Sequence, residues 1–113
     1  SQPDSVIRLG KEVNSLDSLS CDQISPYVDS HFIVITPADM PDIKLKLLQV
    51  NAIISNQVQE NFSLIFEGPL EPMLNQQIYE MEHEQLGSLS LFMVPVARNT
   101  SGMQYEVVFN RLL

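Results

Sequence analysis

The sequence predicts a mostly β domain of about six antiparallel strands in meander order, which form a small barrel or a tight sandwich, with one short N-terminal helix. Two observations favour this fold class. Apolar and polar residues alternate at period two over much of the stretch from residue 31 to residue 112. No helical pattern of about 10–15 residues separates these stretches, which excludes parallel β-α-β units.

The N-terminal part contains the predicted helix. Ser20 can cap it, and Gln23 at the third helical position completes a capping-box pattern. Pro26 limits the helix to one or two turns. Residues 1–17 mix polar and scattered apolar positions, so we expect a flexible N-terminal arm followed by a single β-rich domain over residues 18–113.

The predicted strands are rich in β-branched and aromatic residues and end at proline, glycine or asparagine. They cover residues 31–36, 43–54, 61–66, 77–84, 89–94 and 104–112. A break in parity at Leu47 and Leu48 predicts a β-bulge. We expect Pro95 to end the fifth strand and residues 99–102 to form a hairpin turn before the sixth.

The charge of the chain argues against several partners. Fourteen acidic and six basic residues give a net charge of −8, and the basic residues form no cluster. Nucleic-acid binding and anionic membranes both require cations, and no apolar run reaches the roughly 20 residues of a membrane span. We predict no nucleic acid and no membrane span. The charge serves solubility, or it forms an acidic patch for a basic partner.

The single cysteine, Cys21, excludes an internal disulfide and a cysteine-based zinc site, and we expect it to be structural and partly buried. Residues 1–9 lack the pattern of a signal peptide, which favours a cytoplasmic location or incorporation into an appendage. Met73 and Met103 fall in or beside loops, where thioethers can form an adaptable binding surface, although filling of the core is the default.

The segment richest in ionisable groups carries Glu80, Glu82, His83 and Glu84. Carboxylates and imidazole could ligate a divalent ion or act as an acid and a base. Strand alternation, however, sends His83 to the face opposite the three glutamates. We therefore expect a solvated acidic face, a hydrogen-bonded histidine at the barrel rim, and neither a metal nor a cofactor.

Glu106 is a further candidate, because it shares a strand face with Val108. If that face is partly buried, the carboxylate needs a donor such as Arg98, Arg111 or a backbone N–H. An enzyme would require His83, Glu106 or Cys21 to converge in one cleft, and their spacing gives no reason to expect it. We predict no enzymatic activity.

Several motifs occur in a characteristic order. They are residues 19–32, Phe62–Pro69, Gln77–Tyr79 with His83, Leu86–Gly87, Leu91–Pro95 and Tyr105–Asn110. In this order they resemble an uncharacterised family of small, β-rich bacterial domains of unknown function. The resemblance implies a compact β fold, assigns no catalytic residues, and implies a context beside proteins similar to phage tail-collar and fibre subunits. Many relatives have glycine before the first strand where this chain has Asp29–Ser30, which puts that turn in question.

The leading hypothesis is a non-enzymatic structural or protein-interaction module, an accessory of a phage-tail-like or surface-fibre assembly whose partner is a fibre or collar-like subunit. Contact would use an exposed sheet edge, with residues 1–17 as a strand donor. The alternative is a small-ligand-binding β-barrel, although six strands usually close around packed side chains. An uncharacterised enzyme is the third hypothesis.

Overall fold

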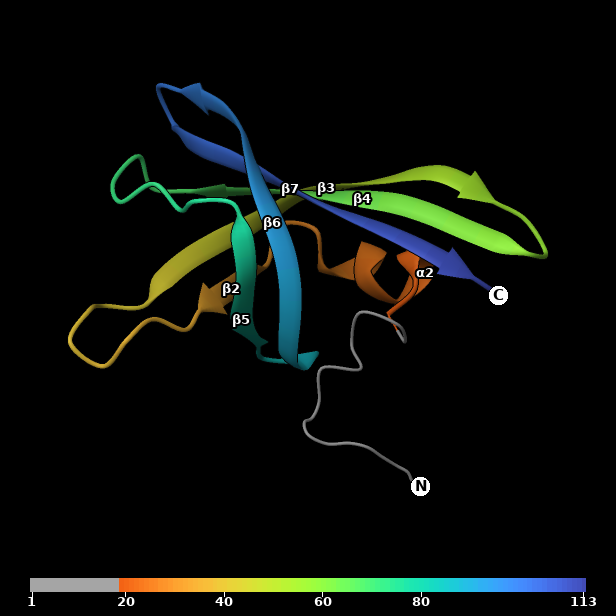
Figure 1. Ribbon diagram of the computed structural model, residues 1–113, viewed down its shortest axis with the longest axis horizontal. Coiled ribbons are helices and arrows are strands. Elements are labelled where there is room, and N and C mark those ends of the chain that lie inside the picture. The colour runs from red at the N-terminus through yellow and green to blue at the C-terminus, as the bar shows by residue number, and fades with distance from the viewer. Residues whose placement is uncertain (1–18) are drawn as a thin grey trace.

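The computed structural model describes residues 19–113, and the predicted arm of residues 1–17 lies outside the described residues. The elements are a short helix α2 (Cys21–Ile24), a 3-10 turn η1 (Ser25–Tyr27), and the strands β2 (His31–Val34), β3 (Ile43–Ser55), β4 (Gln59–Gly68), β5 (Gln77–His83), β6 (Gly87–Asn99) and β7 (Gly102–Leu112) (Figure 1). All paired strands are antiparallel, and the order β2-β3-β4-β7-β6-β5 closes on itself as a barrel. The predicted fold class is confirmed.

The barrel consists of two three-stranded meanders, β2-β3-β4 and β5-β6-β7. β4 pairs with β7 along its whole length, and this pairing joins the two meanders on one side. On the other side β2 and β5 close the ring through the pairs Ile33↔Glu82 and Val34↔Met81. Meander order therefore holds within each half, whereas β4 and β5 follow one another in the chain without pairing.

Side chains that point inward from all six strands fill the interior. Phe32 and Phe66 meet edge to face with ring centroids 5.1 Å apart, and Phe62 stacks on Phe109 at 4.6 Å. The largest fully buried side chains are Tyr105, Phe32, Phe62, Phe66, Ile24, Leu45, Leu47, Leu64, Met81, Leu91, Met93 and Val34. Burial of these apolar groups is the main stabilising contribution to the fold.

Two irregularities in strand pairing bear on the sequence predictions. The register shifts between Leu47 and Gln49, which confirms the predicted bulge. A second shift lies between Pro95 and Ala97, and β6 continues through it to Asn99. The prediction that Pro95 ends this strand was wrong, because a bulge interrupts the hydrogen-bond ladder and tolerates a residue without an N–H.

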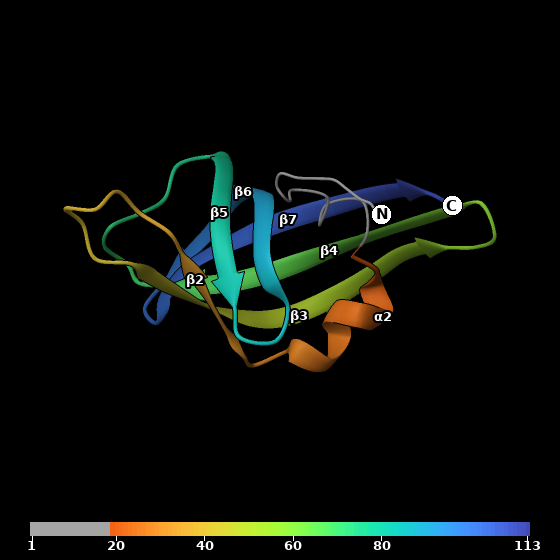
Figure 2. The same ribbon diagram turned by 90° about the horizontal axis from the view of Figure 1, so that it is seen from below.

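The predicted capping box is present at the start of α2. Ser20 Oγ accepts a hydrogen bond from the backbone N–H of Gln23 at 3.1 Å, and Gln23 Oε1 accepts one from the Ser20 N–H at 2.8 Å. The helix gives way to η1, which contains Pro26, after a single turn. α2 and η1 lie against β3, with Ile24 completely buried (Figure 2).

The turn between η1 and β2 contains a residue in the left-handed backbone region. Asp29 has φ = 75°, a conformation that glycine adopts without steric cost. Its N–H donates to the Leu47 carbonyl at 2.7 Å, and Leu47 N–H donates to the Ser30 carbonyl at 3.0 Å. The turn that the resemblance put in question therefore keeps a glycine-like geometry, with an aspartate in place.

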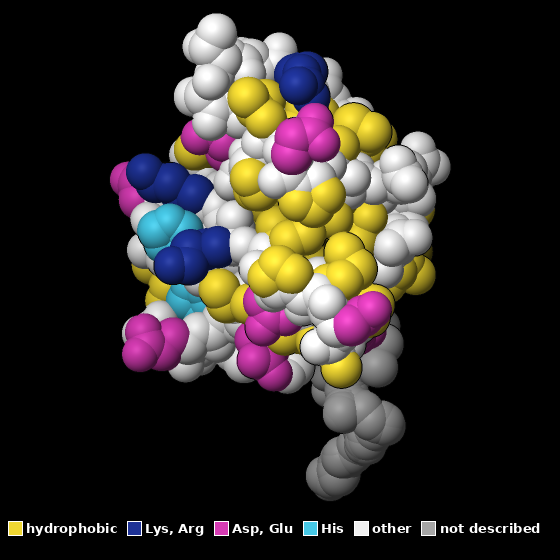
Figure 3. Space-filling view, turned by 90° about the vertical axis from the view of Figure 1, so that its left-hand side faces the viewer, with side chains coloured by type: hydrophobic (Ala, Val, Ile, Leu, Met, Phe, Trp, Pro, Cys, Tyr) yellow, Lys and Arg dark blue, Asp and Glu magenta, His cyan; other side chains and the backbone are white. Residues whose placement is uncertain are grey.

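The longest connections, residues 35–42 between β2 and β3 and residues 69–76 between β4 and β5, lie at the same pole of the barrel, on the left in Figure 1. Figure 3 faces this pole and shows hydrophobic side chains gathered across its middle. α2 and the chain end at Leu113 lie away from it, on the right in Figure 1.

Candidate functional site

The acidic strand β5 has the alternation that the sequence predicts. Glu80, Glu82 and Glu84 are exposed, whereas His83 is only 5% exposed and points to the other side. The three carboxylates therefore do not converge with the imidazole. In the described part of the chain, no group of three or more His, Cys, Asp or Glu side chains is arranged to hold a metal ion.

Both ring nitrogens of His83 are engaged inside the protein. Nδ1 accepts hydrogen bonds from the backbone N–H groups of Gln85 and Leu86, at 3.1 and 3.2 Å. Nε2 lies 2.8 Å from Ser30 Oγ, whose own proton goes to the Tyr27 carbonyl at 2.6 Å. Because Nδ1 accepts and the Ser30 proton is used, Nε2 carries the proton and donates it to Ser30. His83 is therefore neutral.

The surroundings of His83 favour this neutral state. The ring packs against Phe32 and Tyr27 with centroid distances of 4.5 and 4.9 Å. Burial lowers the pKa of His83, and the nearby Glu84 carboxylate opposes this only in part. A hollow of about 360 Å³ lies beside His83, but the imidazole has no free nitrogen to offer it. His83 acts as a structural link between the β5–β6 turn and η1.

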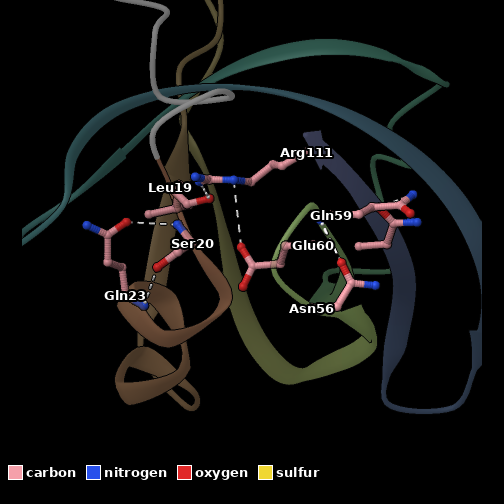
Figure 4. A network of polar contacts seen from close by, with 8 residues as sticks. Leu19, Ser20, Gln23, Asn56, Gln59, Glu60 and Arg111 are labelled. Carbon is pink, nitrogen blue, oxygen red and sulfur yellow. Dashed lines mark hydrogen bonds and ion pairs between the residues drawn. The ribbon is translucent and has the colours of Figure 1, made fainter. Parts of the chain in front are cut away.

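The two arginines named as examples of a donor for Glu106 contact other groups. Arg111 Nη1 donates to the Leu19 carbonyl at 2.8 Å, and its Nε lies 3.7 Å from Glu60 Oε1 (Figure 4). Arg98 Nη1 contacts the sulfur of Met103 at 3.8 Å. Within residues 19–113 Glu106 has no side-chain hydrogen bond, and it is only half-buried. Neither arginine therefore pairs with Glu106, and the partial exposure of this side chain leaves its carboxylate in reach of solvent.

Cys21 also lies apart from the other candidates. Its half-buried thiol lies in α2, and Sγ is 3.9 Å from Ser25 Oγ, one helical turn on. His83 ends β5 and Glu106 lies in β7, so the three groups occupy three separate elements. None of them contacts another among the described residues. The structure therefore does not bring these three candidates together in one cleft, as an acid–base or nucleophilic site built from them would need.

A second hollow, of about 390 Å³, lies at the pole formed by the two long loops. We call the exposed hydrophobic side chains in and beside it the apolar pole: Ile35, Met40, Met73, Ile78 and Phe92. Each is between 42% and 61% exposed. Ile78 on β5 and Phe92 on β6 are direct cross-strand partners, so their side chains lie side by side on the outside of the barrel.

Hydrogen bonds hold the first loop of the apolar pole in place. Thr36 Oγ1 lies 3.0 Å from the Met40 carbonyl and 3.1 Å from the Pro41 carbonyl. Met40 N–H donates to the Pro37 carbonyl at 3.0 Å. These hydrogen bonds fix the backbone that carries Met40.

Two buried tyrosines hold the second loop. Tyr105 Oη accepts a hydrogen bond from the Leu74 N–H at 2.9 Å, and Tyr79 Oη donates to the Asn75 carbonyl at 2.6 Å. Burial, with a smaller contribution from Tyr105, raises the pKa of Tyr79, so its phenol remains a donor. The two loop residues that follow Met73 are thus fixed to the core.

Acidic side chains accompany the apolar pole. Asp39 and Asp42 lie in the first loop, Glu71 lies in the second, and Glu80 lines the hollow. Figure 3 shows acidic side chains beside the hydrophobic area, with Lys and Arg side chains toward its margins. The hydrophobic middle of the pole is therefore flanked by carboxylates, and the cationic side chains lie farther out (Figure 3).

Sequence reasoning found part of this surface. Met73 is exposed as the loop argument suggested, whereas Met103 is 4% exposed and belongs to the core. A further signal for the apolar pole was the alternation of side chains along β5. Ile78 shares its strand face with Glu80 and Glu82, so the sequence places an apolar side chain in an otherwise acidic, solvent-facing row.

Comparisons with known proteins bear on the family alone. No helix within residues 19–113 has the length and apolarity needed to cross a membrane. No curated protein and no solved structure matches the chain. A model of the family described as domain of unknown function (DUF6916) matches residues 19–109, which run from the residue before the helix cap to the last strand. Since this match covers most of the chain and confirms an uncharacterised domain family, the protein belongs to the DUF6916 family of domains of unknown function.

Proposed function

We propose that this domain is a non-enzymatic protein-interaction module that binds its partner through the apolar pole. The observation that carries the proposal is the joint exposure of Ile35, Met40, Met73, Ile78 and Phe92 around one hollow. Contiguous exposed apolar surface of this kind is typical of interaction sites. Burial of such side chains against a partner yields roughly 25 cal/mol for each Å² removed from water.

The hydrogen bonds that fix the backbones of the two loops also support the proposal. Binding is opposed by the entropy lost when loops and side chains become fixed. Thr36 and Tyr105 already hold the two loop backbones, so less of this cost remains. The methionines keep flexible side chains on this fixed frame, and such side chains can adapt to a partner's shape.

The proposed absence of catalysis rests on the separation of the three candidate reactive residues in the fold. His83 uses both nitrogens within the fold, and Cys21 and Glu106 lie on other elements. A finer version of the proposal, with a fibre or collar-like subunit as partner, rests on the family resemblance alone. Copurification with such a subunit from the native host would support that version, and unrelated neighbouring genes would count against it.

A small apolar ligand is the second candidate occupant of the hollow. Its volume of about 390 Å³ falls within the range of roughly 300–1,000 Å³ that is usual for ligand pockets. We favour a protein partner because the exposed apolar surface continues beyond the hollow to Phe92. Thermal stabilisation by a member of a metabolite library, lost in Ile78→Asp, would favour the small ligand instead.

Site-specific photo-crosslinking tests the proposal. A benzophenone amino acid replaces Ile78 at the apolar pole or, as the matched control, Val58, which is 65% exposed in the β3–β4 turn. Irradiation in the native host should give a discrete protein adduct from position 78, and this adduct should disappear when Phe92→Asp is added. Equal adducts from both positions, or no adduct from position 78, would contradict the proposal.

A further inference from the structure

We infer that the segment bound by the apolar pole is a peptide stretch that carries lysine or arginine next to its apolar side chains. This inference rests on the proposed function and specifies the chemistry of the partner. Its starting point is the charge around the hollow. Residues 35–42, 69–76 and 77–83 and the first half of β6 contain several Asp and Glu but no Lys or Arg.

Among the described residues, Asp39, Asp42 and Glu80 form no ion pair. Asp42 Oδ1 accepts from the Thr36 backbone N–H at 3.4 Å, and Glu80 Oε2 accepts from Ser90 Oγ at 2.5 Å. Both donors are neutral, so these hydrogen bonds orient the carboxylates without compensating the charge. Among the described residues Asp39 has neither an ion pair nor a side-chain hydrogen bond.

The nearest ion pair at this end is weak. Arg98 Nη2 lies 4.0 Å from Glu71 Oε2, and the two side chains are 57% and 83% exposed. A pair so exposed to solvent gains little from its attraction and readily exchanges partners. A cation from a binding segment can therefore replace Arg98 beside Glu71 at small cost.

The apolar pole and its charge select among classes of partner. Phosphate backbones and anionic lipid headgroups are repelled by the same carboxylates that attract lysine and arginine. The net charge of −8 extends this attraction beyond the pole and would speed the approach of a basic segment. In such a complex the apolar contacts provide affinity, and the charges provide selectivity and speed of association.

A peptide selection tests the inference with defined probes. A random-peptide display library is selected on the wild-type protein after depletion on Ile78→Asp, and recovered peptides are measured by fluorescence polarisation. We expect sequences with apolar residues flanked by Lys or Arg. In Asp39→Asn/Glu71→Gln we expect about a fivefold weaker Kd for these peptides, with the difference shrinking at high salt.

A matched variant controls for the loss of charge itself. Asp22→Asn/Glu84→Gln removes the same charge from α2 and from the β5–β6 turn, outside the hollow, and should leave the Kd nearly unchanged. Thermal melts of all variants verify that they fold.

The outcomes separate the inference from the proposed function. Peptides that depend on Ile78 but lack cations, or that bind Asp39→Asn/Glu71→Gln as tightly as wild type, would overturn the basic partner and leave the docking surface intact. A failure to recover any peptide dependent on Ile78 would overturn both. Binding of phosphatidylcholine vesicles that Ile78→Asp abolishes would assign the pole to a membrane surface and would also overturn both.

Discussion

At the scale of single residues, His83 shows how a polar group is accommodated in an apolar interior. Its imidazole accepts from the turn at Gln85 and Leu86 and donates to Ser30, so the neutral ring has a partner at each nitrogen. The alternation of side chains along the predicted strand 77–84 already indicated that His83 points inward. Its partner Ser30 lies 53 positions earlier in the chain, and no local pattern could reveal that contact.

The lowered pKa of His83 predicts that folding stability depends on pH. The unfolded chain binds a proton near pH 6.5, whereas the folded protein binds it only at lower pH. Stability is therefore complete above about pH 6.5 and falls as the pH drops toward the folded-state pKa, by about 1.4 kcal/mol for each unit of difference between the two pKa values. Urea denaturation at a series of pH values measures this slope.

Two variants isolate the contribution of His83. His83→Gln should remove this part of the pH dependence while lowering stability overall. His31→Gln removes an exposed imidazole from β2 and should leave the wild-type slope in place. An unchanged slope in His83→Gln would show that another group titrates in this range.

At the scale of elements, the strands were predictable because burial on one face imposes period two and turn residues mark the ends. Pro95 was misread because the same residue can end a strand or occupy a bulge, and only the pairing with Gln104 and Tyr105 distinguishes the two. The pairing of β4 with β7 was also hidden, because it joins segments about forty residues apart and local patterns do not encode partners.

The close approach of β4 and β7 gives a prediction for Gly102, the first residue of β7. A Cβ atom at this position would collide with the carbonyl oxygen of Gly68, so the two strand ends would have to separate. Gly102→Ala should lower the free energy of unfolding by about 1–3 kcal/mol, measured by urea denaturation.

Gly87 provides the control for Gly102. It has φ = 80° in the β5–β6 turn, and a Cβ there would meet nothing within 4 Å. Asparagine tolerates this backbone region, so Gly87→Asn should cost less than about 1 kcal/mol. Equal losses in the two variants would refute the steric explanation.

At the scale of the whole molecule, the barrel is closed unevenly. β4 and β7 pair from end to end, whereas β2 and β5 pair at Ile33↔Glu82 and Val34↔Met81, with one further bond from the Ile35 N–H to the Glu80 carbonyl at 2.9 Å. Composition and periodicity predicted a β domain that forms either a small barrel or a tight sandwich, with dispersed ionisable groups. The apolar pole could not be predicted as a unit, since it forms only when two distant loops meet.

Uneven closure predicts uneven protection against amide hydrogen exchange. The Ile35 amide at the β2–β5 junction should exchange at least about tenfold faster than the amides in the middle of β4, such as Leu64, because opening this junction disturbs fewer contacts. Exchange followed by NMR at neutral pH measures both. Equal protection at the two sites would indicate that the barrel opens only by global unfolding.

The hydrogen bond between Arg111 and the Leu19 carbonyl has a consequence for how the domain can be attached to a surface or to another protein. It fastens the beginning of the described chain to the last strand. The helix α2 and the end of the chain at Leu113 lie on the side of the barrel that faces away from the apolar pole (Figure 1). A fusion partner or surface anchor attached after Leu113 would hold the domain on the side opposite the apolar pole. The apolar pole would then point away from the attachment point and remain accessible to solvent.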